Sequence, residues 1–260
     1  MALIRCEFFS EVLMLSTSMT VVLPQSTFNQ SARDKHPTLF LLHGYSDDDS
    51  MWLRHTSIER YAEDYGLAVV MPKVDHSFYT DMKYGNKYWT FLTEELPVIA
   101  RSFFSLSEKR EDNFVAGLSM GGYGAFKWAL HFPEKFAAAV SLSGALDMVT
   151  RVNDVRAEAE NDNPWSIKKP LSLVFGDQDI SGSGYDLIAM LRLFTQSNKQ
   201  KPLLYQACGT EDFLYEGNIN FKNACSETSF ILTTDFGPGD HSWKYWDSKI
   251  KDVLAWLPIK

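Results

Sequence analysis

The sequence of 260 residues is 45% hydrophobic and 22% charged, a balance that predicts one globular α/β domain with a sizeable core over residues 1–260. Its formal net charge of −8, without dense clusters of lysine and arginine, excludes a typical nucleic-acid-binding protein and disfavours polyanionic substrates. No apolar run approaches the roughly 18 residues that a membrane-spanning helix needs, so we expect no membrane span.

Strand-like and helix-like segments alternate along the whole chain. Two β-rich stretches at about 3–13 and 18–23 predict a pair of antiparallel strands at the N-terminal edge of a sheet. Short buried strands are then expected at 38–44, 67–72, 114–116, 137–143, 171–175, 203–207 and 229–233. Helices are expected at 52–64, 89–104, 123–130, 186–196 and 242–256, the second of them broken or kinked at Pro97.

This alternation predicts repeated strand–helix–strand units, and therefore a mostly parallel central sheet with helices on both faces. In such sheets the functional groups gather at the carboxyl ends of the strands. The longest segment without an assigned element, about 145–169, could form a small cap over that edge. It is too short for a large independent lid domain.

A Gly-x-Ser-x-Gly motif with Ser119 at its centre is the most informative feature of the chain. An apolar run precedes the motif and a helix-like run follows it, as expected for a sharp strand-to-helix turn that exposes a nucleophilic serine. Gly117 and Gly121 suit this nucleophile elbow because the flanking chain passes too close for side chains. The bare pattern is weak, and its alternative interpretation is a tight turn whose serine caps a helix. The motif in this setting predicts the α/β-hydrolase fold.

A nucleophilic serine needs a histidine as its base and a carboxylate to orient that histidine. In α/β-hydrolases these residues follow the serine in the order acid, histidine. Four of the six histidines precede Ser119, and His131 falls at the far end of the elbow helix, roughly 18 Å away at 1.5 Å per residue. His241 lies between the last predicted strand and the last predicted helix, and it is therefore the predicted base.

Three aspartates could supply the carboxylate. Asp212 follows the penultimate predicted strand through a glycine-containing turn, and Asp177 and Asp179 follow the predicted strand 171–175 in the same way. We favour Asp212, because it lies one unit before His241 and the apolar residues after it would shield its contact with the imidazole. Asp177 and then Asp179 are the alternatives.

Two backbone N–H groups should form an oxyanion hole, which stabilises the negative charge of the transition state. The predicted donors are Met120, directly after the serine, and Tyr45, in the loop after strand 38–44. We interpret His43 as a structural residue that orients this loop through hydrogen bonds. The acidic run at 47–49 favours a solvated loop over a cation site, because consecutive carboxylates point in different directions. The chemistry needs no metal and no organic cofactor.

The cysteines Cys6, Cys208 and Cys225 are widely spaced and odd in number. This pattern predicts reduced, mostly buried thiols and neither a disulfide framework nor a metal site. The N-terminus has charges inside its apolar stretch and no small-residue cleavage site, so it is a poor signal peptide. We therefore expect a cytoplasmic protein.

These residues together resemble the esterase D/tributyrin esterase family of α/β-hydrolases. The resemblance rests on Leu-Leu-His-Gly-Tyr-Ser at 41–46, Ala-Gly-Leu-Ser-Met-Gly-Gly-Tyr-Gly at 116–124, Cys-Gly-Thr-Glu-Asp-Phe-Leu-Tyr at 208–215 and Asp-His-Ser-Trp-Lys-Tyr-Trp at 240–246. It implies a triad of Ser119, Asp212 and His241 in a cytoplasmic, often oligomeric esterase of short-chain acyl esters. The sequence departs from the family at Ser242, where an acidic residue is expected, and at 170–180, where more loop is expected.

The predicted function is hydrolysis of short-chain acyl esters by a serine carboxylesterase whose partner is a small-molecule ester and which could form homo-oligomers. The alternatives are an S-formylglutathione hydrolase or other thioesterase, a carbohydrate acetyl esterase with the same triad, and a non-catalytic α/β-hydrolase that only binds. Aromatic side chains are expected to wall the pocket, and the candidates are Trp52, Tyr84, Trp89, Trp165 and Trp243.

Overall fold

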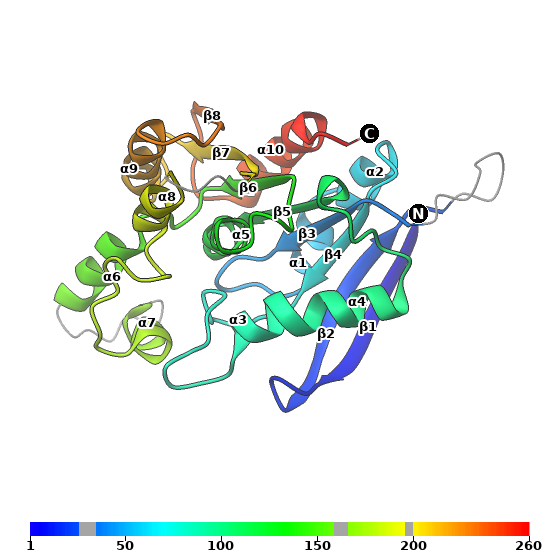
Figure 1. Ribbon diagram of the computed structural model, residues 1–260, viewed down its shortest axis with the longest axis horizontal. Coiled ribbons are helices and arrows are strands. Elements are labelled where there is room, and N and C mark those ends of the chain that lie inside the picture. Colours follow the sequence, from blue (N-terminus) through cyan, green and yellow to red (C-terminus); the bar gives the residue numbers. More distant parts are fainter. Residues whose placement is uncertain (26–34, 159–165, 196–199, 260) are drawn as a thin grey trace.

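A computed structural model describes residues 1–25, 35–158, 166–195 and 200–259. In these residues eight strands form one sheet in the order β1-β2-β4-β3-β5-β6-β7-β8 (Figure 1). The strands are β1 (Ala2–Ser10), β2 (Leu15–Leu23), β3 (Thr38–Leu42), β4 (Ala68–Pro72), β5 (Asn113–Leu118), β6 (Ala138–Leu142), β7 (Leu203–Gly209) and β8 (Leu232–Gly237). The β1–β2 and β2–β4 pairs are antiparallel and the other pairs are parallel. The predicted α/β-hydrolase fold is thus confirmed.

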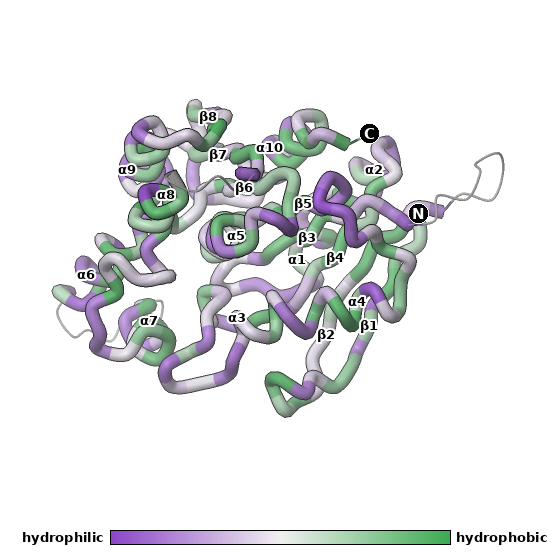
Figure 2. The backbone as a smooth tube through the Cα atoms, viewed as in Figure 1, coloured by the Kyte–Doolittle hydropathy of each residue, from purple (hydrophilic) through white to green (hydrophobic). Residues whose placement is uncertain are grey.

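The central strands are buried on both faces, which explains their continuous apolar runs. Every residue of β5 is buried. Phe114 and Ala116 belong to one apolar core and Val115 to the other, because successive side chains of a strand point to opposite faces. Figure 2 shows hydrophobic residues along these central strands.

Helices cover both faces of the sheet. On one face α1 (Met51–His55), α2 (Ile58–Glu63) and α10 (Trp243–Trp256) contribute to a common core. The core on the other face receives side chains from α4 (Leu96–Phe103), α5 (Met120–His131), α6 (Met148–Ala157), α7 (Lys168–Phe175), α8 (Leu187–Thr195) and α9 (Tyr215–Ser226). Among the described residues, no helix has the length and apolar character needed to cross a membrane.

The segment 171–175 is helical, and the prediction of a strand there is wrong. It lies in α7, where Leu171, Val174 and Phe175 are buried. Their spacing of i, i+3 and i+4 is the period of a helix that covers a core with one face. Asp177 and Asp179 therefore follow a helix and not a strand end.

Smaller differences concern the bounds of other elements. The helix expected at 52–64 is divided between α1 and α2. The helix expected at 89–104 consists of α3 (Tyr88–Thr90), a π-helical turn (Phe91–Glu95) and α4, with Pro97 in the first turn of α4. The last strand begins at Leu232, three residues later than expected. α6 lies in the segment expected as a cap, of which residues 159–165 lie outside the described part.

Candidate active site

Ser119 stands at a sharp turn between β5 and α5. Its φ of 52° lies in the left-handed region that non-glycine residues rarely adopt. A Cβ at Gly117 would lie 2.3 Å from the carbonyl carbon of Gly121, and a Cβ at Gly121 would lie 2.4 Å from the carbonyl oxygen of Leu42. Side chains are therefore excluded at both glycines, and the geometry is that of a nucleophile elbow.

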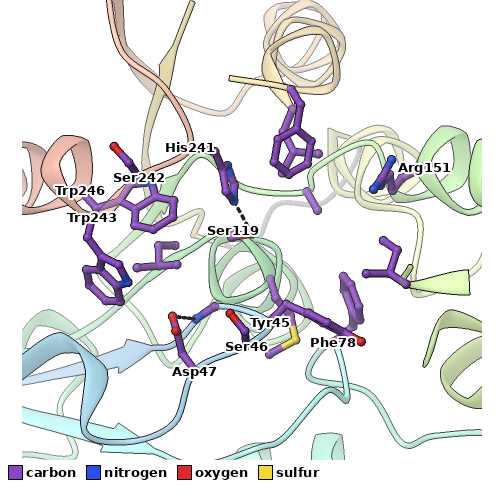
Figure 3. Close-up of a pocket in the computed structure, with 17 residues that line it drawn as sticks. Tyr45, Ser46, Asp47, Phe78, Ser119, Arg151, His241, Ser242, Trp243 and Trp246 are labelled. Atoms are coloured by element: carbon purple, nitrogen blue, oxygen red, sulfur yellow. Dashed lines mark hydrogen bonds between the residues drawn. The ribbon is translucent and has the colours of Figure 1, made fainter. Parts of the chain in front are cut away.

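The Ser119 hydroxyl is hydrogen-bonded to His241, which is in turn hydrogen-bonded to Asp212. Ser119 Oγ lies 2.9 Å from His241 Nε2 (Figure 3), and His241 Nδ1 lies 2.8 Å from Asp212 Oδ2. The three residues come from the chain after β5, β7 and β8, at the carboxyl ends of the strands. Because the Asp212 carboxylate accepts a hydrogen bond from Nδ1–H, the proton of the neutral imidazole stays on Nδ1, and Nε2 is free to accept the serine proton.

The Asp212 carboxylate is buried and held by several donors. Its side chain has no exposed surface, and Oδ1 accepts a 2.8 Å hydrogen bond from the Leu214 N–H. Burial alone would raise the pKa of Asp212, but hydrogen bonds from His241, Leu214 and Ser143 outweigh it and lower the pKa. Ser143 Oγ accepts a 3.0 Å hydrogen bond from Trp246 Nε1, which leaves its own proton available to the carboxylate. Asp212 is thus ionised at neutral pH.

The His241 ring is held between aromatic side chains. Its centroid lies 4.5 Å from that of Phe213, and 4.9 Å from that of Trp246, whose ring is perpendicular to it. The side chain keeps 19% of its surface exposed, and the residue lines the pocket described below. These contacts fix the plane of the imidazole with Nε2 toward Ser119.

The predicted oxyanion donors, Met120 and Tyr45, both line the pocket beside Ser119. Met120 is the first residue of α5, where a backbone N–H has no partner within the helix. Within the described residues, neither backbone N–H donates a hydrogen bond to another group of the chain. Both are therefore available to an oxygen that carries negative charge.

His43 is buried and shapes the loop that carries Tyr45. Its Nδ1 donates to the Gly44 carbonyl at 2.7 Å, and its Nε2 accepts from the Val74 N–H at 3.1 Å. A protonated ring could not accept that bond, and burial lowers the pKa of His43 despite the Gly44 carbonyl and the aspartates nearby. The Tyr79 hydroxyl donates to the His43 carbonyl at 2.9 Å. The ring therefore orients the loop, as interpreted from the sequence.

The carboxylates of the acidic run 47–49 point in different directions. Asp47 and Asp48 accept hydrogen bonds from N–H groups of their own loop. Asp49 is 1% exposed and accepts hydrogen bonds of 3.0 Å from Ser18 and 2.7 Å from Thr20, both on β2. The expectation of a solvated loop is therefore wrong for Asp49, which fastens the loop to the sheet. Among the described residues, no group of three potential metal ligands is found.

A pocket of about 610 Å³ opens beside Ser119. Trp243 and Trp246 lie on one side of Ser119, and Phe78 and Arg151 lie on the other (Figure 3). The other lining residues are Gly44, Tyr45, Ser46, Asp47, Leu118, Met120, Ala145, Ile167, Phe213, Leu214, His241 and Ser242. The volume and the mostly apolar lining are typical of a site for a small molecule.

The aromatic residues predicted to wall the pocket fall in different places. Trp243 lines it, but Trp52 is buried behind Trp243, edge-on at 5.2 Å, with its indole N–H bonded to the main chain of β3. Tyr84 is 61% exposed beside α7, and Trp89 packs at the far end of α5. The predictions of Trp52, Tyr84 and Trp89 as lining residues are therefore wrong, and Trp165 lies outside the described residues.

The alternative acids do not reach the histidine. Asp177 and Asp179 are exposed beyond the end of α7, and Asp179 accepts hydrogen bonds from the backbone and hydroxyl of Ser181. His241 is bonded to Asp212 instead. The geometry thus brings together the favoured three residues and separates both alternatives from them.

Sequence reasoning assigned no role to Ser143 or Arg151. Ser143 follows β6 directly, and this position at a strand's carboxyl end was the available signal. Arg151 lies on α6, with its guanidinium 5.8 Å from the Phe213 ring. A single arginine in a segment without a motif gives no signal in the sequence.

The fold and this site define the chain as an α/β-hydrolase of the serine hydrolase class. It belongs to the Esterase family, whose model, described as "Putative esterase", matches residues 10–257. An acetyl esterase of Caldicellulosiruptor saccharolyticus is 30% identical over 264 residues, which cover 99% of this chain and 98% of that protein.

Two solved Staphylococcus aureus structures are similar over nearly their whole length. Substrate-bound FphF, a fluorophosphonate-binding serine hydrolase, has a TM-score of 0.88 and 36% identity, covering 100% of this chain and 99% of that one. The S-formylglutathione hydrolase FrmB has a TM-score of 0.83 and 37% identity, covering 99% and 98%. The chain is thus an enzyme that acts on carboxylic ester bonds.

Proposed function

We propose that the chain is a serine carboxylesterase of short-chain acyl esters, of the esterase D/tributyrin esterase type, with Ser119, His241 and Asp212 as its catalytic triad. The observation that carries the proposal is the continuous hydrogen-bond chain from Ser119 Oγ to the buried Asp212 carboxylate. An apolar pocket opens directly beside the serine. A surface serine that merely caps a helix would have neither feature.

In the proposed reaction Ser119 Oγ attacks the ester carbonyl carbon while His241 Nε2 takes its proton. Asp212 holds the imidazole tautomer and stabilises the imidazolium that forms. The Met120 and Tyr45 N–H groups donate to the carbonyl oxygen as it becomes negative. His241 then gives its proton to the leaving alkoxide, and water hydrolyses the acyl-serine by the same route. These steps use only groups of the chain and water.

The first experiment is labelling with a fluorophosphonate, which forms an adduct with an activated serine. We expect one adduct per chain on Ser119 in the folded protein, and none in Ser119→Ala. Folded protein that forms no adduct would contradict the proposal and favour a non-catalytic binding protein.

Acyl-chain specificity is the second test. A series of 4-nitrophenyl esters from acetate to laurate should give its highest kcat/KM at acetate to butyrate, because the bulky rings of Trp243 and Trp246 line one side of the pocket. The name of the acetyl esterase relative supports the same substrate class. A maximum at laurate would contradict the short-chain assignment.

A thioesterase acting on S-formylglutathione is the second candidate, and Arg151 favours it. The guanidinium lines the pocket, and among the described residues no carboxylate forms an ion pair with it. Glutathione as a leaving group carries carboxylates that this cation would attract. Arg151→Gln should then lower kcat/KM for S-formylglutathione about tenfold and leave 4-nitrophenyl acetate unchanged. Arg192→Gln, an exposed change outside the pocket, is the charge-matched control.

A carbohydrate acetyl esterase with the same triad is compatible with the acetyl esterase relative. Acetate release from acetylated xylo-oligosaccharides, compared with 4-nitrophenyl acetate, separates it from a simple carboxylesterase. The cytoplasmic location stays a prediction from the cysteine pattern and the N-terminal sequence.

A further inference from the structure

Among the described residues, β1 is an edge strand of the sheet, and none of them pairs with its outer side. It is the first strand in the order of the sheet, and it pairs with β2 without interruption from Ala2↔Leu23 to Ser10↔Leu15. No backbone hydrogen bond joins residues 2–9 to a described segment other than β2. A straight edge of this length presents a row of N–H and C=O groups that another strand can pair with.

The exposed side chains of β1 are complementary to those of a second, antiparallel copy of the same strand. Leu3, Arg5, Glu7 and Phe9 alternate along the strand and are its exposed residues. When two copies of β1 are laid antiparallel about a twofold axis at Cys6, residues equally distant from Cys6 lie opposite each other. Leu3 then faces Phe9 of the other copy, and Arg5 faces Glu7 of the other copy. The twofold axis repeats each pair on its other side, and all of these side chains lie on the same face of the sheet.

We propose that β1 pairs with β1 of a second copy of this chain, which joins the two sheets into one across a twofold axis at Cys6. Each pair of opposite charges and each apolar pair across such strands is stabilising. Within the described part of its own chain, neither Arg5 nor Glu7 has an ion-pair partner. Their neighbours on β2 are the uncharged Thr20 and Ser18. The second copy supplies the missing charges.

Apolar surface continues beside this edge. Met14, in the turn after β1, is 76% exposed, and Val98 and Phe103 of α4 are 67% and 54% exposed. α4 crosses the β1–β2 end of the sheet (Figure 1). An uncovered apolar edge of this kind favours non-specific aggregation, so a partner that covers it has a physical reason to bind.

The opposite edge of the sheet lacks these features. β8 has six residues, and its Asp235 is already bonded to Lys249 and Tyr205. Self-complementarity about one point also distinguishes a second copy from an unrelated partner, because only a twofold pair of identical strands requires it. The interface is therefore assigned to β1.

Charge exchange tests the pairing in solution. The unmodified chain should sediment as a dimer, and Arg5→Glu or Glu7→Arg alone should weaken the dimer at least tenfold, because each places like charges opposite one another twice. The double variant R5E/E7R restores opposite charges and should restore the dimer. Arg192→Glu on α8 is exposed and should have no effect. A cooperative thermal unfolding transition in each variant would show that the variants remain folded, with a lower Tm expected for the two that lose the dimer.

Oxidative crosslinking through Cys6 tests the register of the proposed β1–β1 pair. Directly opposite residues of antiparallel strands have Cα atoms about 4.5–5.5 Å apart, within the span of a disulfide. Mild oxidation with copper–phenanthroline should link two chains through Cys6 in the unmodified protein and in R5E/E7R, but not in Cys6→Ser, since Cys208 and Cys225 are buried. A monomer at micromolar concentration, or a dimer that R5E does not weaken and that Cys6 does not crosslink, would overturn the proposal.

Discussion

Removing the Ser143 hydroxyl tests whether Asp212 needs more support than its histidine supplies. The hydroxyl accepts a hydrogen bond from the Trp246 N–H at 3.0 Å, and its own proton is available to Asp212, whose side chain has no exposed surface. A hydrogen bond to a charged group contributes about 1.5–3 kcal/mol. If this energy keeps Asp212 ionised and His241 oriented in the transition state, its loss lowers kcat about ten- to hundredfold, since 1.36 kcal/mol corresponds to a factor of about ten.

Two variants separate the hydroxyl from the backbone. Ser143 has a φ of 49°, which glycine adopts without strain. Ser143→Gly and Ser143→Ala should therefore lose the same factor in kcat for 4-nitrophenyl acetate, with KM nearly unchanged, while the alanine variant has the lower Tm. Ser141→Ala is the matched control, because the Ser141 hydroxyl is buried on β6 without a hydrogen-bond partner among the described residues. Full kcat in Ser143→Gly, or an equal loss in Ser141→Ala, would refute the reasoning.

Three further predictions concern the acid, a buried cation and the elbow. Asp212→Asn should lower kcat about 10⁴-fold, whereas Asp177→Asn should not change it; the reverse result would reassign the acid. Burial lowers the pKa of Lys127 from 10.5 to about 7 in the folded chain. Between these pH values the Lys127 side chain is protonated in the unfolded chain and neutral in the folded chain, so the unfolding free energy rises with pH. Relative to Lys127→Met, the unfolding free energy should therefore rise by about 1.4 kcal/mol per pH unit above pH 7, as measured by urea unfolding; a constant difference would contradict the burial of a charge. Gly117→Ala should destabilise by about 3 kcal/mol or more, because its Cβ would meet the Gly121 backbone, and an unchanged Tm would rule out the elbow geometry.

The parts of the fold that the sequence predicted best are those set by local chemistry. The elbow can be predicted because the turn leaves no room for side chains at the two glycines that flank Ser119, so the motif is strict. The edge strands and the central strands can also be predicted. Burial on one face gives an alternating hydrophobic pattern, whereas burial on both faces gives a continuous apolar run. Strand 171–175 was mispredicted because a short apolar run fits either period, and the buried spacing of Leu171, Val174 and Phe175 favoured the helix.

The pocket was harder to predict because its walls come from loops far apart in the sequence. Trp52 and Trp243 are both aromatic residues near the site, yet one is buried behind the other, and no local pattern distinguishes them. Arg151 lies on α6, and it lines the pocket together with residues that are far from it in the sequence. The order serine, acid, histidine placed Ser119, Asp212 and His241 correctly near one another because chain order in this fold determines strand position.

The two hydrogen bonds that Asp49 accepts from β2 limit how far this enzyme can be shortened or redesigned. The N-terminal hairpin looks dispensable at the margin of the sheet, but Ser18 and Thr20 supply the hydroxyl groups that satisfy a carboxylate with 1% exposure. A chain without the hairpin would leave that carboxylate buried and without these donors, at the base of the loop that bears Tyr45. The hairpin therefore helps to hold the loop that carries Tyr45, and a minimal catalytic unit has to include it.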